Sequence, residues 1–321
     1  MLLHLRVTVP TDRSDAVREL FAGSAGVAHL AVLPGASLAP AGDLFLVDVA
    51  RESADELVRG LRRLHVDVDG GIAMESVDAA VSRPAEEAER RAPGDGADAV
   101  VWEQVVRTTA ADASLSVAFL AFLTIATLLA AIAIVTDSAI LTVGAMVLGP
   151  EFGPLAALAL ALVHRRREMG RSALVSLVTG FAVAIALTTV LALAARGLGW
   201  IEPSLLAEDR PNTGFITDPD KWSLVVAVLA GIAGVLSLTA SKSGALVGVF
   251  ISVTTVPAAG DMALSLALGG SDQFWESATQ LGVNLLGILI AALVTLTLQR
   301  AVWRRVPTSV PRVGGVGSRR G

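Results

Sequence analysis

Six long apolar segments fill the chain from residue 115 to residue 299, and they restrict the possible folds more than any other feature. A helix of roughly 20 apolar residues crosses the hydrocarbon core of a bilayer. Only 17% of the residues are charged and 53% are hydrophobic, whereas a typical soluble domain is about 25% charged. We therefore predict an α-helical integral membrane bundle of six transmembrane helices. The expected spans are residues 115–135, 138–163, 172–195, 223–240, 244–268 and 275–299.

Charges in the loops predict how these spans are oriented. Arg165, Arg166, Arg167 and Arg171 follow the second span, Lys242 follows the fourth, and a basic tail follows the sixth. The loops after the first, third and fifth spans are mainly acidic. Because basic loops stay on the cytoplasmic side, we expect a multi-pass protein of the cell (plasma) membrane with both termini in the cytoplasm. The lipid bilayer is its first expected partner.

The first 81 residues have the pattern of a soluble domain. Apolar and polar residues alternate in the expected strands, and amphipathic helices are expected after Thr11 or Asp12 and from Ser53 onward. A turn is expected at Pro34–Gly35. The order β-α-β-β-α-β is typical of an α+β ferredoxin-like domain, and both a structural or oligomerising role and ligand sensing stay open for it. The expected strands are residues 2–9, 27–33, 43–50 and 71–81.

The segment between the two halves is expected to be partly helical. Glu87 and Arg91 have the i,i+4 spacing of an exposed helix. Further on, Trp102 and Val106 share one side of an expected interfacial helix, for which the extended start of the first span is the alternative. The predicted organisation is a cytosolic ferredoxin-like domain over 1–81, a linker and interfacial helix over 82–112, the six-helix transmembrane domain over 113–300 and a flexible basic cytosolic tail over 301–321.

Composition argues against several classes of protein. The net charge of −5 argues against nucleic acid as a partner, because phosphate binding needs a basic face. The chain has no cysteine, which excludes a disulfide framework and a thiolate metal site. Its histidines are scattered, and we find no nucleophile–base or metal-ligand arrangement. We therefore predict no enzyme activity, no metal and no cofactor.

The membrane half resembles itself when it is shifted by roughly 105 residues. Spans 1, 2 and 3 then fall on spans 4, 5 and 6. The similar middle segments are SAILTVGAMVLGPEFGPLAALALAL (138–162) and SGALVGVFISVTTVPAAGDMALSLAL (243–268). Chance similarity between apolar helices is the alternative. Since a unit of three spans re-enters the membrane from the opposite side, a real repeat predicts the 3+3 inverted arrangement of many secondary transporters.

Helix-breaking residues and polar groups in spans 2, 5 and 6 mark a candidate binding site. Proline removes a backbone donor, and the carbonyl it leaves free must be buried in protein or face a water-filled cavity. A charge inside the bilayer costs about 2.5–3.5 kcal/mol on insertion scales, so such residues usually face the bundle interior. The candidates for binding a substrate or ion are Gly149, Pro150, Glu151, Gly153, Pro154, Thr254, Thr255, Pro257, Asp261 and Asn284.

Several of these residues also have a structural interpretation. Glu151 could be protonated by burial or paired with Lys242, and Asp261 could cap the last part of its helix. The two threonines could bond back to the preceding helical turn. Asn284 could join two helices by an amide hydrogen bond, and for Asp137, expected in the turn after the first span, we favour a structural role.

Four motifs resemble one known family. They are GAMVLGPEFGPLAALALAL (144–162), DRPN (209–212), SKSGALVGVFISVTTVPAA (241–259) and NLLGI (284–288). Over about residues 110–300 the chain resembles the domain of unknown function 389 family, whose members are hydrophobic bacterial and archaeal membrane proteins without an established activity. Gly149 and Glu151 replace a serine and an apolar residue of the usual family segment, and Pro257–Ala258 replaces a double proline. Glu151 is therefore not expected to be essential across the family.

The combined features predict a transporter or channel-like protein for an ion or a small solute. The solute would bind between the breaks of spans 2 and 5, where Glu151 would supply a titratable or cation-binding carboxylate. The alternative is a non-transporting oligomeric membrane scaffold or sensor whose N-terminal domain binds a ligand or partner. We also expect a homo-oligomer, since small α+β domains can pair through their edge strands.

Overall fold

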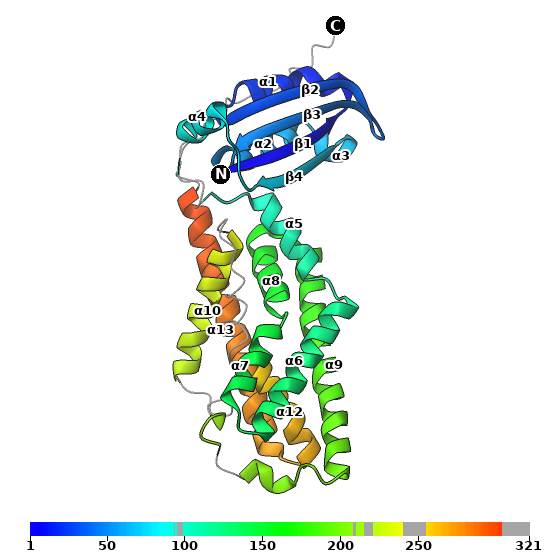
Figure 1. Cartoon of the computed structure of the whole chain (residues 1–321), viewed down its shortest axis with the longest axis vertical. Helices are drawn as coiled ribbons and strands as arrows, with labels where there is room; N and C mark the ends of the chain where they lie inside the picture. Colours follow the sequence, from blue (N-terminus) through cyan, green and yellow to red (C-terminus); the bar gives the residue numbers. More distant parts are fainter. Residues whose placement is uncertain (93, 95–98, 208–209, 215–220, 240–254, 304–321) are drawn as a thin grey trace. The chain divides into compact units, whose positions relative to one another are not determined.

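Figure 1 shows the computed structural model, which describes residues 1–92, 94, 99–207, 210–214, 221–239 and 255–303. The chain divides into two compact units. The main part of the first, which we call the N-terminal unit, is Met1–Val105. The second, which we call the helical unit, contains Val106–Leu238 and Ser243–Ala301.

The N-terminal unit is built on one four-stranded antiparallel sheet. Its elements are β1 (Leu2–Val9), the 3-10 turn η1 (Thr11–Arg13), α1 (Ser14–Ala22), β2 (Val27–Leu38), β3 (Ala41–Ala50), α2 (Arg51–Arg63), α3 (Val66–Asp69), β4 (Gly71–Val77) and α4 (Arg83–Arg91). The strands lie in the order β2-β3-β1-β4. Along the chain, strands and helices follow the predicted β-α-β-β-α-β order, with η1 and α3 as short additions and α4 after the last strand.

One face of the sheet, together with α1 and α2, forms the core of this unit. Leu3, Leu5 and Val7 are fully buried and alternate with more exposed residues along β1, as the two-residue period of a strand requires. Leu57 and Leu61, four residues apart on α2, bury the predicted apolar stripe against them. The helix predicted in the linker is α4, which contacts β2 and β3.

Two local predictions in the N-terminal unit are wrong. The turn expected at Pro34–Gly35 lies inside β2. Gly35 adopts φ = +63°, which glycine tolerates, and its N–H donates to the Asp43 carboxylate at 2.8 Å. The chain therefore passes this point as an irregularity in the β2–β3 ladder. The helix expected to begin at Ser53 begins at Arg51.

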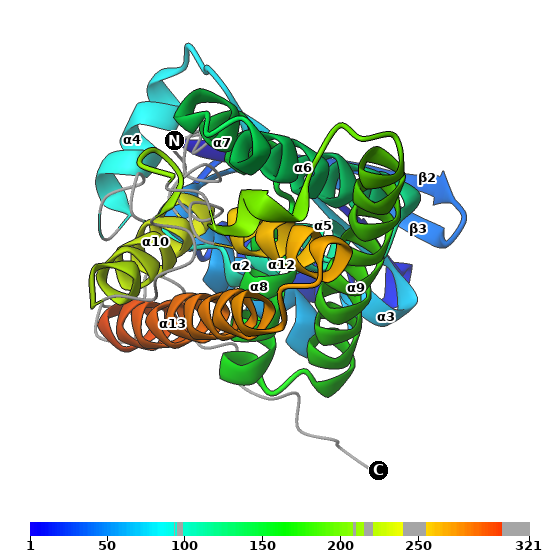
Figure 2. The ribbon, with the colours of Figure 1, turned by 90° about the horizontal axis from the view of Figure 1, so that it is seen from below.

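The helical unit consists of apolar helices of unequal length. They are α6 (Val117–Val135), α7 (Ala139–Leu148), α8 (Phe152–His164), α9 (Arg167–Gly197), the 3-10 turn η2 (Pro203–Ala207), α10 (Lys221–Thr239), α12 (Val256–Leu268) and α13 (Ser271–Trp303), while α5 (Trp102–Asp112) crosses the division between the units. Helix α12 lies at the centre of the unit, in contact with α6, α9 and α13 (Figure 2). Almost all of its residues are buried.

The prediction of six spans is supported in part. Among the described residues, three helices are long and apolar enough to cross a membrane, namely Val117–Val135, Arg167–Gly197 and Ser271–Val302. Helices α7 and α8 would form a fourth span, bent by 49° at the break between them. Helices α10 and α12 are shorter, and most of the expected first half of span 5 lies outside the described residues.

The helix boundaries repeat along the chain at a constant interval. Helices α6 and α10 both have 19 residues, and α8 and α12 both have 13. In each pair the second helix begins 104 residues after the first, and α13 begins 104 residues after α9. The interval is close to the shift of roughly 105 residues at which the sequence resembles itself, while the inverted repeat stays a prediction. Positions separated by 104 residues are called counterparts below.

Candidate functional site

The candidate site begins at two places where a helix starts beside a proline. Helix α7 ends at Leu148 and α8 begins at Phe152, so Gly149, Pro150 and Glu151 lie in the break between them. Pro154 lies in the first turn of α8, and Pro257 lies in the first turn of its counterpart α12. Proline is tolerated there because the N–H groups of a first turn have no partner within the helix.

Glu151 and Thr255 join the two helix starts. Each immediately precedes its helix, and the Thr255 hydroxyl donates to the Glu151 Oε1 atom at 2.6 Å. Both side chains are completely buried. The two residues are 104 positions apart, so this contact is made between counterparts. Two residues that the sequence analysis assigned to the same candidate site are therefore in direct contact.

Three further candidates are Gly153, Asn284 and Thr254. Gly153 brings the start of α8 close to the end of α5, because a Cβ atom there would lie 3.0 Å from the Asp112 carbonyl oxygen. Asn284 is fully buried on α13. Thr254 lies outside the described residues, as does Lys242, the partner considered for Glu151.

Asp261 belongs to a separate polar cluster. Its fully buried carboxylate accepts hydrogen bonds from the Ser277 hydroxyl at 2.6 Å and from the Gln273 side-chain amide at 3.1 Å. A third donor is the Arg210 guanidinium, 3.3 Å away. Because the carboxylate bonds these side chains, it does not cap α12 as the structural alternative supposed. We call Arg210, Asp261, Gln273 and Ser277 the Asp261 cluster.

Sequence reasoning missed three members of this cluster. Arg210 is part of the DRPN motif, which the sequence analysis used only as one of the motifs that resemble the family. Gln273, Ser277, Gln280 and Asn284 have spacings of four, three and four residues, which place them along one side of α13. That polar row was the signal that could have identified the partners of Asp261.

Asn212 of the DRPN motif and the following Thr213 bind a second carboxylate, that of Asp137. Asp137 accepts hydrogen bonds from the Asn212 backbone and side-chain amides and from the Thr213 hydroxyl, which lies 2.8 Å away. Burial raises the pKa of Asp137, but these hydrogen bonds outweigh it and lower the pKa overall. Asp137 thus fixes the connection between α9 and α10, in keeping with the structural role that we favoured.

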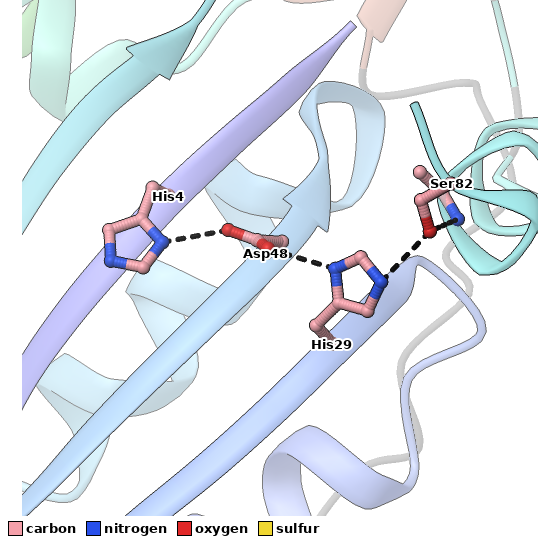
Figure 3. A network of polar contacts seen from close by, with 5 residues as sticks. His4, His29, Asp48 and Ser82 are labelled. Carbon is pink, nitrogen blue, oxygen red and sulfur yellow. Dashed lines mark hydrogen bonds and ion pairs between the residues drawn. The ribbon is translucent and has the colours of Figure 1, made fainter. Parts of the chain in front are cut away.

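A further polar network lies on the sheet of the N-terminal unit. In Figure 3 the Asp48 carboxylate lies between two imidazole rings, 2.7 Å from His4 Nδ1 and 2.9 Å from His29 Nδ1. His29 Nε2 is 2.9 Å from the hydroxyl of Ser82, which precedes α4. The network ties β1, β3 and β2 to the start of α4. Within the described ranges, no group of three or more His, Asp or Glu residues is placed to hold a metal ion.

Asp48→Asn is expected to weaken the N-terminal unit by about 1 kcal/mol at pH 7, since the carboxylate keeps partial contact with water. Burial raises the pKa of Asp48, but the hydrogen bonds from His4 and His29 lower it overall. This stabilisation is present above the ordinary carboxyl pKa and is lost as the pH falls below it. Hydrogen exchange of the β1 and β3 amides in the full chain should show the difference at pH 7 and its decline towards pH 3. Asp15→Asn, at a residue 94% exposed, is the control, and an equal difference at both pH values would contradict the prediction.

The described helices and the buried polar groups between them are compatible with a helical membrane protein that carries a small antiparallel sheet at its N-terminus. Residues 146–290 match the family described as Domain of unknown function (DUF389), so this segment belongs to that family, as predicted. The matched segment contains Glu151, Thr255, the Asp261 cluster and Asn284.

One curated relative is similar over a longer part of the chain. It is an uncharacterized protein of Methanocaldococcus jannaschii, 25% identical over 209 residues. The match covers 65% of this chain and 61% of the relative, which is less than two thirds of the relative's length. No solved structure matches the chain.

Proposed function

We propose that the helical unit is a transporter or channel-like protein for an ion or a small solute, built from six spans in a 3+3 inverted repeat. The observation that carries this proposal is the buried hydrogen bond between Glu151 and Thr255. A residue can contact its own counterpart only close to the axis that relates two repeats. The two helix starts would therefore meet on a pseudo-two-fold axis, where inverted-repeat transporters form their binding sites.

The constant interval between helix boundaries supports the same arrangement. The first proposed repeat consists of α6, the broken span α7–α8 and the long helix α9, and the described helices of the second are α10, α12 and the long α13. Three crossings are an odd number, so the second repeat would enter the bilayer from the opposite face. The break between α7 and α8 supplies the backbone groups that a midplane site requires.

A column of buried polar groups supports a path through the unit. Helices α12 and α13 are joined through Gly269 and Gly270, and the contact between Asp261 and Ser277 holds them side by side. Thr255, on the α12 side, and Asn284, on the α13 side, are separated from this junction by the same number of residues. With an equal rise per residue in both helices, Thr255 and Asn284 have similar depths. Buried polar groups thus continue from the Asp261 cluster to the level of Glu151.

Glu151 favours a cation or a proton as the transported species, because a buried carboxylate attracts positive charge. Since its side chain is fully enclosed in this conformation, passage would require the two helix starts to separate. In this proposal the protein lies in the cell membrane with both termini in the cytoplasm, acts as a homo-oligomer and has no enzymatic activity.

Glu151→Gln is expected to reduce flux at least tenfold and to alter its pH dependence, because the amide keeps the shape of the side chain but neither titrates nor carries a negative charge. The measurement is uptake of a panel of cations and small solutes into liposomes that contain the purified full chain. Glu276→Gln, the same substitution at an exposed position of α13, should leave the rate unchanged. If Glu151→Gln retains both the rate and its pH dependence, Glu151 is not part of the path. If the unaltered protein moves no solute of the panel, the scaffold or sensor alternative is favoured.

A further inference from the structure

The Asp261 cluster has the construction of a binding site. Its carboxylate is fully buried, and two of its donors, Gln273 and Ser277, come from the neighbouring helix. The third, Arg210, comes from the connection between α9 and α10. A buried charge persists only where other groups compensate it. Arg210 is the cation that compensates Asp261 in this conformation.

Under the proposed repeat, the counterpart positions indicate that helix packing does not require these polar groups. The counterparts of Asp261, Gln273 and Ser277 are Ala157, Met169 and Ala173. Ala157 and Ala173 belong to one buried apolar cluster, and Met169 packs against it. The same helix positions are therefore filled by small and apolar side chains in the first half of the helical unit. Packing alone therefore does not explain why Asp261, Gln273 and Ser277 occupy these positions in the second half.

Arg210 is the most weakly fixed partner of Asp261. Its 3.3 Å contact is the longest of the three, and its side chain is 10% exposed whereas Asp261 is completely buried. The residue belongs to a connection rather than to one of the long helices. That connection is held separately through the contacts of Asn212 and Thr213 with Asp137. Arg210 could therefore leave Asp261 while the connection stays attached.

An additional oxygen atom lies along the same side of α13. Gln280 follows Ser277 by three residues, which puts it one helical turn further along the row. Its side chain is buried, and its Oε1 atom has no hydrogen-bond partner among the described residues. A buried amide oxygen without a partner is costly, and it is a suitable ligand for a hard cation.

We propose that Asp261, Ser277 and the amide oxygen of Gln280 form a site for a monovalent cation, joined by the amide oxygen of Gln273 once that side chain turns its nitrogen away from Asp261, and that the Arg210 guanidinium is its built-in competitor. The single carboxylate balances one positive charge, whereas a divalent ion would leave an uncompensated charge in the interior. Carboxylate, hydroxyl and amide oxygens suit an alkali cation, and the position of Arg210 suits an organic guanidinium or ammonium group equally well. The cation would enter as Arg210 leaves, so the two exclude each other.

The test is cation binding to the purified full chain in detergent. The thermal unfolding midpoint is followed while NaCl, KCl or guanidinium chloride is added at up to 20 mM, about the range where a millimolar site saturates, against a background of bulky N-methylglucamine. For Arg210→Gln, at least one cation should raise the midpoint, with half-saturation at least tenfold lower than for the unaltered chain. The responding salt distinguishes an alkali cation from a guanidinium-type one. Asp137→Asn, at the other carboxylate that holds the connection, should behave like the unaltered chain.

The double variant Arg210→Gln/Asp261→Asn should lose the response, because it lacks both the competitor and the charged ligand. The proposal is overturned if none of the three cations stabilises Arg210→Gln, or if the double variant responds equally. Failure of Arg210→Gln to fold in the presence of every cation would overturn it too, since a bound cation should replace the guanidinium. The site extends the proposed transport function, but binding in detergent requires no flux, so the two proposals can fail separately.

Discussion

In the absence of a small cation, Arg210→Gln is expected to destabilise the helical unit by about 3–5 kcal/mol. This is the range measured when one partner of a buried ion pair is removed and the other charge stays in the interior. The Asp261 carboxylate is completely buried and would keep only the neutral donors Ser277 and Gln273. Unfolding in mixed detergent–dodecyl sulfate micelles, followed by tryptophan fluorescence in N-methylglucamine buffer, measures the loss.

A double-mutant cycle separates this electrostatic effect from simple loss of packing. Adding Asp261→Asn to Arg210→Gln removes the uncompensated charge and should restore most of the lost stability. Asn212→Ala is a useful comparison, because it alters the same connection but leaves Arg210 and Asp261 in place. Equal instability of the single and the double variant would mean that Arg210 acts through shape or backbone position and not through its charge.

The parts of the fold that depend on neighbouring residues could be predicted from the sequence. The strands of the N-terminal unit follow from alternation, as in Leu3, Leu5 and Val7. The break before α8 follows from Gly149 and Pro150, which act on the backbone where they stand. The prediction of a turn at Pro34–Gly35 is wrong because a contact with the partner strand holds this segment: the Asp43 carboxylate accepts a hydrogen bond from the Gly35 N–H, and pairing of β2 with β3 resumes at Ser37.

The contacts of the site could be predicted less well, since they depend on pairing over long distances. Glu151 and Thr255 were both candidates, but their hydrogen bond joins positions 104 residues apart. Arg210 and Asp261 are 51 residues apart, and no local pattern links a connection to the middle of α12. The loop charges that predict orientation treat such an arginine as a marker of the membrane side. They give no indication that it reaches a buried carboxylate.

Replacing the Asp261 cluster by its counterparts should abolish cation binding without unfolding the protein. The combined variant is Asp261→Ala, Gln273→Met and Ser277→Ala, with Arg210→Val because Val106 is the counterpart of Arg210. Substituting apolar groups for a buried ion pair is often neutral or stabilises by about 1–4 kcal/mol. The alanine and methionine side chains already fill these positions in the first half. We therefore expect an unfolding midpoint in micelles equal to or above that of the unaltered chain, together with no response to Na⁺, K⁺ or guanidinium. A folded variant that still binds the cation would place the site elsewhere, whereas a variant that unfolds would show that the polar cluster is needed for the fold.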